Sequence, residues 1–253
     1  MFNNHSAAVN GERWFYNKIK KDINVIFDVG SRYDSEFSNF GGEVHYFEPV
    51  EEFIKKLSVL PNSNKVSKFN NFGLGSKNEE KYYYDSIQSF NARTKSLPGV
   101  IQEKKNKLQI KTGYDYMKEQ NIESIDFLKI DTEGYEFEVI KGFKEKLNCI
   151  KIIQFEYGGC YLDNNVKLND VIKYLESKNF HNFSYLDSNS LKKIKDLRGK
   201  TITTCPEHRN GQWSSIQYPV TVEHMNEDGV ISDHYNYCNI VCINKNSNLD
   251  YIF

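Results

Sequence analysis

Hydrophobic positions along this chain follow two patterns: short continuous apolar runs, and apolar residues spaced three or four apart. The first pattern indicates buried strands and the second indicates amphipathic helices. Apolar runs predict strands at residues 24–28, 43–47, 65–74, 125–130 and 149–155, with a β-like stretch at 81–84. Helical spacing predicts helices at about 11–22, 53–60, 112–120 and 168–175, another after Gly134, and a short loop-helix at 34–40. This alternation favours an α/β fold with a doubly wound, mostly parallel sheet covered on both faces.

Acidic residues stand where three of the predicted strands end. Asp28 precedes Gly30, Glu48 closes the next strand, and Asp131 and Glu133 follow the strand at 125–130. Ligands of open α/β sheets bind outside the carboxyl ends of the strands. A glycine turn after one strand and an acid about 20 residues later is typical of nucleoside binding, because the acid accepts hydrogen bonds from the ribose. Each acid could instead only cap a helix or pair with a lysine.

The first loop lacks the glycine-rich cradle that binds a pyrophosphate. Gly30 is followed by Ser31, Arg32, Tyr33 and Asp34, with no second glycine. A pyrophosphate would therefore have poor access to backbone amides. This pattern disfavours a dinucleotide oxidoreductase and favours a nucleoside ligand without phosphates.

Several short motifs occur in an order that resembles the FkbM-type S-adenosylmethionine-dependent O-methyltransferases. They are Phe27–Gly30, Tyr46–Pro49, Phe72–Ser76, Phe127–Glu136 with Ile140–Gly142, and Ile153–Gly158. The run Lys-Ile-Asp-x-Glu-Gly-x-Glu is the most specific of them. The resemblance spans about residues 20–180 and adds a closing strand near 236–243. It implies a Rossmann-like class I methyltransferase fold, S-adenosylmethionine as cofactor, and a hydroxyl of a sugar, glycan or other polar metabolite as methyl acceptor.

The resemblance also implies a set of cofactor-binding residues at the motif positions. They are Asp28, Gly30, Ser31, Arg32, Glu48, Pro49, Phe72, Gly73 and Asp131. Glu48 is the expected ribose ligand. The family usually shows Gly-Ala-Asn-x-Gly in the first loop, where this chain has Gly30-Ser-Arg-Tyr-Asp34. Arg32 in this altered loop could bind the methionine carboxylate through a bidentate pair, or pair at the surface with Asp34 or Glu36, and we favour the surface pair.

Methyl transfer to a hydroxyl requires a group that helps to remove the hydroxyl proton. Asp131, Glu133 and Glu156 lie on or just after neighbouring strand ends, so we predict that they converge as catalytic residues. Three close carboxylates repel one another, which either raises one pKa or recruits a cation. We favour a divalent cation held by Asp131 and Glu156, because oxygen ligands suit Mg²⁺ or Ca²⁺.

Residues 188–235 interrupt the alternation of strands and helices before the last strand. A long irregular insert in a compact domain is usually functional or disordered. Trp213 and three of the six histidines lie in it, and they favour a functional lid or acceptor-binding wall within one domain of residues 1–253. His208 is a candidate general base. Zinc binding by Cys205 and His208 is disfavoured, because no second Cys/His pair follows at finger-like spacing.

Composition narrows the class of partner. The chain of 253 residues has a formal net charge of -1, whereas nucleic-acid binding normally needs a basic face. A small-molecule or glycan acceptor is therefore expected. An RNA ribose 2'-O-methyltransferase and a catalytically inactive nucleoside-binding module remain as alternatives. No apolar run is long enough for a bilayer, and the five cysteines lack Cys-x-x-Cys spacing, so we expect free thiols in a cytoplasmic protein.

Overall fold

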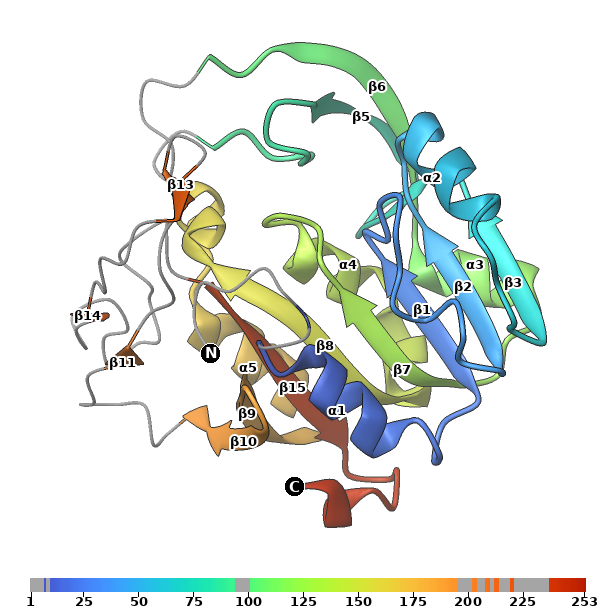
Figure 1. Cartoon of the computed structure of the whole chain (residues 1–253), viewed down its shortest axis with the longest axis vertical. Coiled ribbons are helices and arrows are strands. Elements are labelled where there is room, and N and C mark those ends of the chain that lie inside the picture. Colours follow the sequence, from blue (N-terminus) through green and yellow to red (C-terminus); the bar gives the residue numbers. More distant parts are fainter. Residues whose placement is uncertain are drawn as a thin grey trace.

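The computed structural model describes residue 7 and residues 10–93, 101–194 and 237–253, together with four two-residue strands between residues 202 and 220. A central sheet of eight strands has the order β10-β9-β15-β8-β7-β1-β2-β3 (Figure 1). Its strands are β1 (Val25–Val29), β2 (Glu43–Phe47), β3 (Val66–Asn70), β7 (Ile125–Ile130), β8 (Ile150–Gly158), β9 (Phe180–Asp187), β10 (Ser190–Lys193) and β15 (Tyr237–Asn244).

The five strands from β3 to β8 are parallel, and β15 inserts antiparallel between β8 and β9. The chain runs outward from β1 through β2 to β3 and then returns to β7 on the other side of β1. Such a reversal of strand order opens a crevice at the carboxyl ends of the two central strands. The carboxyl ends of β1 and β7 are therefore the expected place for a ligand.

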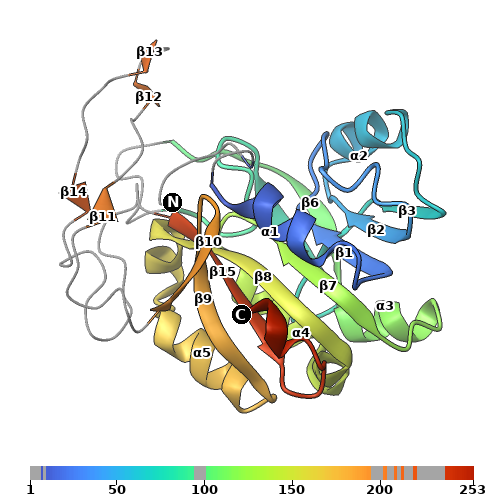
Figure 2. The same ribbon diagram turned by 60° about the horizontal axis from the view of Figure 1, so that its bottom comes forward.

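Helices cover both faces of this sheet. On one face lie α1 (Glu12–Ile19) and α2 (Glu51–Ser58), and on the other lie α3 (Gly113–Glu119), α4 (Glu136–Gly142) and α5 (Leu168–Glu176). Successive residues of β1 point to opposite faces of the sheet. Ile26 lies in the core on the side of α1 and α2, and Phe27 lies in the core on the side of α3, α4 and α5. Figure 2 shows α1 and α5 on opposite sides of the sheet. The predicted doubly wound, mostly parallel fold is confirmed.

A second sheet of three strands arches over the carboxyl edge of the first (Figure 1). Its strands, in the order β4-β6-β5, are β4 (Gly73–Leu74), β5 (Glu79–Tyr84) and β6 (Lys104–Lys111). The single strand predicted at 65–74 was wrong, because the chain leaves β3 after Asn70 and joins the other sheet at Gly73. Asn71 stabilises the break by donating hydrogen bonds to the carbonyl groups of Glu48 and Pro49.

One further local prediction was wrong, and one strand was not predicted. Residues 34–40 form turns rather than a loop-helix. There the side-chain oxygen of Asn64 accepts hydrogen bonds from the N–H groups of Phe40 and Gly41. In a helix, backbone carbonyl groups would accept these hydrogen bonds. The strand at 180–187 was not predicted, because its mixed polar and aromatic composition hides the period. It forms a hairpin with β10, so the first residues of the predicted insert belong to the central sheet.

Other predictions agree with the structure. The predicted helix at 112–120 is α3, and the hydroxyl of its N-cap residue Thr112 accepts a hydrogen bond from the backbone N–H of Asp115. The closing strand is β15, and the cysteines among the described residues, Cys149, Cys160, Cys238 and Cys242, are free. Within the described part of the chain, no helix has the length and apolar character needed to cross a bilayer.

Most of the predicted lid, and Cys205 with it, falls outside the described residues. Four short strands are described there: β11 (Ile202–Thr203), β12 (His208–Arg209), β13 (Gln212–Trp213) and β14 (Pro219–Val220). They form two antiparallel pairs, β11 with β14 and β12 with β13. His208 lies in β12, but its side chain is outside the described structure, so its proposed role as a base stays a prediction.

Candidate active site

A pocket lies at the carboxyl ends of β1, β2, β7 and β8, and it encloses about 920 Å³ including its open mouth. Its wall includes residues of all four strand ends, residues of α1 and residues of the β5 region. Six of the nine predicted cofactor-binding residues line it: Gly30, Arg32, Glu48, Pro49, Gly73 and Asp131. The predicted catalytic residues Glu133 and Glu156 line it too.

Glu48 marks one end of the pocket. Its carboxylate accepts hydrogen bonds from the backbone N–H groups of Arg32 at 3.1 Å and Val50 at 2.8 Å. Burial raises the pKa of Glu48 to about 7, although these two N–H groups and the Arg32 charge oppose the shift. A buried acid with this pKa lines the pocket beside the first glycine turn, which is the position expected for a ribose ligand.

Gly30 allows the loops after β1 and β7 to meet. It has φ of 84°, and a Cβ placed on it would lie 1.8 Å from the carbonyl oxygen of Asp131. The N–H of Asp131 donates to the carbonyl of Val29 at 2.9 Å, which holds the two strand ends together. Only glycine fits at this position, because a side chain would push Asp131 out of the pocket wall.

Three predicted cofactor residues do not line the pocket. Asp28 is buried behind it, accepts a hydrogen bond from the Ser35 hydroxyl, and has its pKa raised by burial to about 6. Ser31 is buried, and its hydroxyl lacks a partner among the described residues. Phe72 packs edge-on against Phe47 in the core. The structure places these residues as support for the pocket rather than as its surface.

Arg32 lies on the pocket rim, and its guanidinium lies 5.4 Å from the ring centroid of Tyr33. From the sequence we favoured a surface ion pair of Arg32 with Asp34 or Glu36. Glu36 instead pairs with Arg13 at 3.0 Å. Among the described residues, no ion pair joins Arg32 to Asp34. The position of Arg32 at the rim suits the other reading, in which it contacts a ligand carboxylate.

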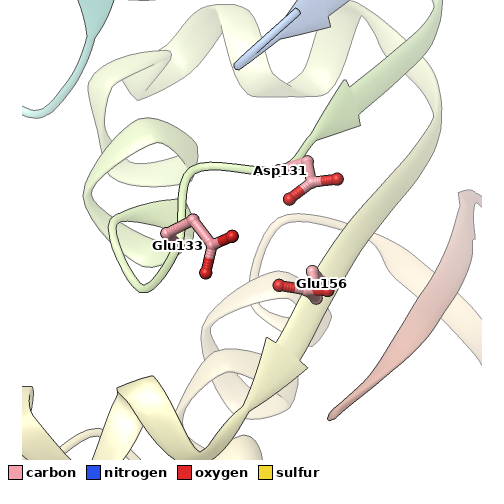
Figure 3. Close-up of side chains that lie close together, drawn as sticks. All are labelled: Asp131, Glu133 and Glu156. Carbon is pink, nitrogen blue, oxygen red and sulfur yellow. The ribbon is translucent and has the colours of Figure 1, made fainter. Parts of the chain in front are cut away.

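The side chains of Asp131, Glu133 and Glu156 lie close together, as Figure 3 shows, and all three line the pocket. One carboxylate oxygen from each lies within 4.8 Å of the other two. Asp131 follows β7 directly, Glu133 lies in the turn before α4, and Glu156 lies near the end of β8. The strand ends therefore bring together the three acids that the sequence singled out.

The three acids differ in their counter-ions. Asp131 pairs with Lys129 at 3.2 Å, and Glu133 pairs with Arg93. Glu156 has no hydrogen-bond or ion-pair partner for its carboxylate among the described residues. Burial raises its pKa well above the ordinary value, and the charges of Asp131 and Glu133 raise it further. Glu156 therefore takes up a proton more readily than an ordinary carboxylic acid does.

The buried cations also bear on metal binding. Burial lowers the pKa of Lys129, but the charges of Asp131, Glu12 and Asp28 outweigh it and raise the pKa overall. Lys129 is therefore a permanent cation beside Asp131. The oxygen atoms of the cluster suit a hard divalent cation in kind, yet two of the three acids already have a cationic side chain as partner. This arrangement favours proton transfer over metal binding.

Sequence reasoning missed several residues that build the site. Glu12 at the start of α1 lines the pocket, accepts a hydrogen bond from Gln154 and lies 3.8 Å from Lys129. Tyr83 and Phe90 form an aromatic wall from the β5 region. Lys129 belongs to the most specific motif of the chain, so the motif itself was the available signal for it. Neither Glu12 nor the aromatic pair has a local signal, because only chain folding brings them to the pocket.

A match to a family model identifies the family of this chain. The family model described as the methyltransferase FkbM domain matches residues 28–182, more than half of the chain. No curated protein matches. A solved structure that resembles the chain is a candidate methyltransferase from Streptococcus mutans in complex with SAH, with 8% identity, a TM-score of 0.40, and coverage of 92% of this chain and 98% of that chain. The matched range contains Glu48 and the three converging acids, and the chain belongs to the FkbM methyltransferase family.

Proposed function

We propose that this protein transfers a methyl group from S-adenosylmethionine to a hydroxyl of a sugar, glycan or other polar metabolite. The observation that supports the proposal best is the division of one pocket into two ends. Glu48, which follows β2, lies on the side suited to a nucleoside, and Asp131, Glu133 and Glu156, at the ends of β7 and β8, lie on the side suited to proton transfer, with Gly30 of the intervening β1 loop between them.

The cofactor would lie along the crevice between β1 and β7. Its ribose hydroxyls would donate hydrogen bonds to Glu48, and Arg32 would pair with its carboxylate. Tyr83 and Phe90 offer apolar surface for a planar base. The sulfonium would then lie toward the acid cluster, where negative charge favours it over neutral product.

The reaction is an in-line displacement in which the acceptor oxygen bonds to the methyl carbon as the carbon–sulfur bond breaks. The hydroxyl proton passes to a carboxylate of the cluster. Glu156 suits this role, because its carboxylate has no counter-ion among the described residues and its raised pKa makes it a stronger base than an ordinary carboxylate. The positive sulfonium would lower the raised pKa of Glu156 and so prepare it to accept the proton. Lys129 and Arg93 would keep Asp131 and Glu133 in place beside it.

Calorimetry with S-adenosylmethionine, followed by an assay of SAH release across a panel of sugars, glycans, polar metabolites and RNA, tests the proposal. We expect cofactor binding and turnover with a neutral hydroxyl acceptor. Turnover on RNA alone would favour a ribose methyltransferase, and binding without turnover on any acceptor would favour an inactive nucleoside-binding module. Absence of cofactor binding would contradict the proposal altogether.

The same assay decides whether a divalent cation takes part. With Lys129 and Arg93 as counter-ions, we expect full turnover after chelation. Activity lost on chelation and restored by Mg²⁺ would assign Asp131 and Glu156 to a metal instead.

A further inference from the structure

The turn between β7 and α4 holds a pocket residue in an unfavourable backbone conformation. Glu133 has φ of 55° and Gly134 has φ of 100°. The left-handed region is costly for a residue with a Cβ, and such a conformation persists only where surrounding contacts hold it. The contacts that hold Glu133 therefore belong to the construction of the site.

One buried carboxylate binds the N–H groups of this turn. Oε1 of Glu136 accepts hydrogen bonds from the N–H of Thr132 at 2.8 Å, the N–H of Gly134 at 3.1 Å and the hydroxyl of Thr132 at 3.1 Å. Glu136 is the first residue of α4 and is completely buried. Its Oε2 has no partner among the described residues. A single oxygen thus ties together the residues on both sides of Glu133.

Side chains from two other segments bind the carbonyl groups of the turn. The Ser89 hydroxyl donates to the carbonyl of Glu133 at 2.9 Å. The amides of Asn91 and Asn164 donate to the carbonyl of Gly134 at 3.0 and 2.9 Å. With N–H and carbonyl groups both occupied, the backbone on either side of Glu133 cannot relax to a right-handed conformation without breaking several hydrogen bonds.

We propose that Glu136 is a positioning residue of the methyl-transfer site. By binding Thr132 and Gly134 it forces Glu133 into the left-handed conformation that brings its carboxylate beside Asp131 and Glu156. This inference rests on the proposed function. It assigns a role to the last acid of the most specific motif, which itself does not line the pocket.

The protonation state of Glu136 does not alter this role. Burial raises its pKa to about 7, while the N–H groups that it binds oppose the shift. Whether Oε2 carries a proton or not, Oε1 remains free to accept the three hydrogen bonds. Glutamine, which keeps one acceptor oxygen, should therefore replace glutamate, whereas a side chain without an acceptor should not.

Two substitutions at this position separate the acceptor from the volume of the side chain. Glu136→Leu removes the acceptor, and we expect lost exchange protection at the amides of Thr132 and Gly134 and S-adenosylmethionine binding weaker by roughly tenfold or more. Glu136→Gln should keep both properties within about threefold of wild type. Calorimetry and residue-resolved hydrogen exchange on the full chain measure the two effects.

Asp126→Leu is the matched control, because Asp126 is also a buried acid that binds two backbone N–H groups, at the opposite end of β7. It should lower stability and leave cofactor affinity unchanged, which separates positioning from general support of the fold. A folded Glu136→Leu protein with wild-type affinity, or with both amides still protected, would overturn the inference.

If Glu136→Leu does not fold, Glu136→Asp replaces it, since a carboxylate one methylene shorter cannot reach both amides. Wild-type affinity in that variant would also overturn the inference. A wild-type protein that binds no S-adenosylmethionine would overturn the proposed function instead. Hydrogen exchange at Thr132 and Gly134 would still decide whether Glu136 holds the turn.

Discussion

The two ends of β7 carry acids of the same kind in opposite situations. At the amino end, the carboxylate of Asp126 accepts hydrogen bonds from the N–H groups of Asn24 at 2.7 Å and Val25 at 2.9 Å. It also pairs with Lys151 at 2.6 Å. This acid joins β1 and β8 to β7, and each of its oxygens has a partner.

At the carboxyl end, the acids are crowded and incompletely paired. Asp131, Glu133 and Glu156 lie within 4.8 Å of one another, and the carboxylate of Glu156 lacks a partner among the described residues. An acid that supports the fold binds all that it can, whereas an acid that serves a ligand keeps binding capacity free. The comparison teaches that structural and ligand-binding acids differ in whether all their carboxylate oxygens have hydrogen-bond or ion-pair partners. Their position relative to a strand does not separate them.

The largest effect that this comparison predicts is on turnover. Asp131→Asn and Glu156→Gln keep the shape of the side chain and remove its ability to accept a proton. Each should lower methyl turnover by roughly 10² to 10⁴, the range for loss of an acid–base group. The rate of SAH release, measured at saturating cofactor on an acceptor from the panel, checks this. Full activity in both variants would mean that Asp131 and Glu156 only support the fold, as Asp126 does.

A smaller effect is expected for cofactor affinity. Glu48→Ala should weaken S-adenosylmethionine binding by about 1.5 to 3 kcal/mol, the usual scale for a hydrogen bond to a charged group. Titration calorimetry measures it. Glu43→Ala, at the amino end of the same strand, is the control and should leave affinity unchanged. Equal affinities in the two variants would remove Glu48 from the ribose site.

Substitution of Asp126, at the amino end of β7, should change the stability of the protein and not its cofactor affinity. Asp126→Ala leaves two buried N–H groups without their acceptor, and the expected loss is about 1 to 3 kcal/mol of unfolding free energy. Chemical denaturation measures this loss, and calorimetry should show unchanged cofactor affinity. An altered affinity would mean that the two ends of the strand are coupled, which would break the comparison.

The smallest effect concerns pH. Burial raises the pKa of Asp28 to about 6 and those of Glu48 and Glu136 to about 7, all above their ordinary values. Between the ordinary pKa and the raised pKa of each acid, the folded state binds more protons than the unfolded state. Burying these acids therefore costs the least stability at low pH and more as they ionise. We expect stability to fall as the pH rises from about 5 to about 8.

His45 acts in the opposite direction over part of that range. Burial lowers its pKa, so its contribution is lost as the pH falls. Three acids outweigh one histidine, and the melting temperature without cofactor should be higher at pH 5.5 than at pH 8, values roughly on either side of these pKa shifts. A melting temperature that rises with pH would show that the acids at the pocket are better paired than their surroundings indicate.

The sequence by itself determined the class of fold and the position of the acids along the chain. Apolar runs marked β1, β2, β7 and β8, because buried parallel strands need continuous apolar residues. Asp131 and Glu133 came directly after such a run, and the topology rule for parallel sheets then placed them at a ligand-binding edge. The single strand at 65–74 failed, because apolar character does not say which sheet a residue joins.

Only the tertiary structure decided how the acids differ from one another. Arg93 reaches Glu133 from 40 residues away, and Glu12 reaches Gln154 from 142 residues away. No local pattern records such contacts, because they depend on how the whole chain folds back over the sheet. Burial and counter-ions set the proton affinity of each carboxylate. The sequence therefore determined where the acids stand, and the three-dimensional environment decided the burial and the counter-ion of each.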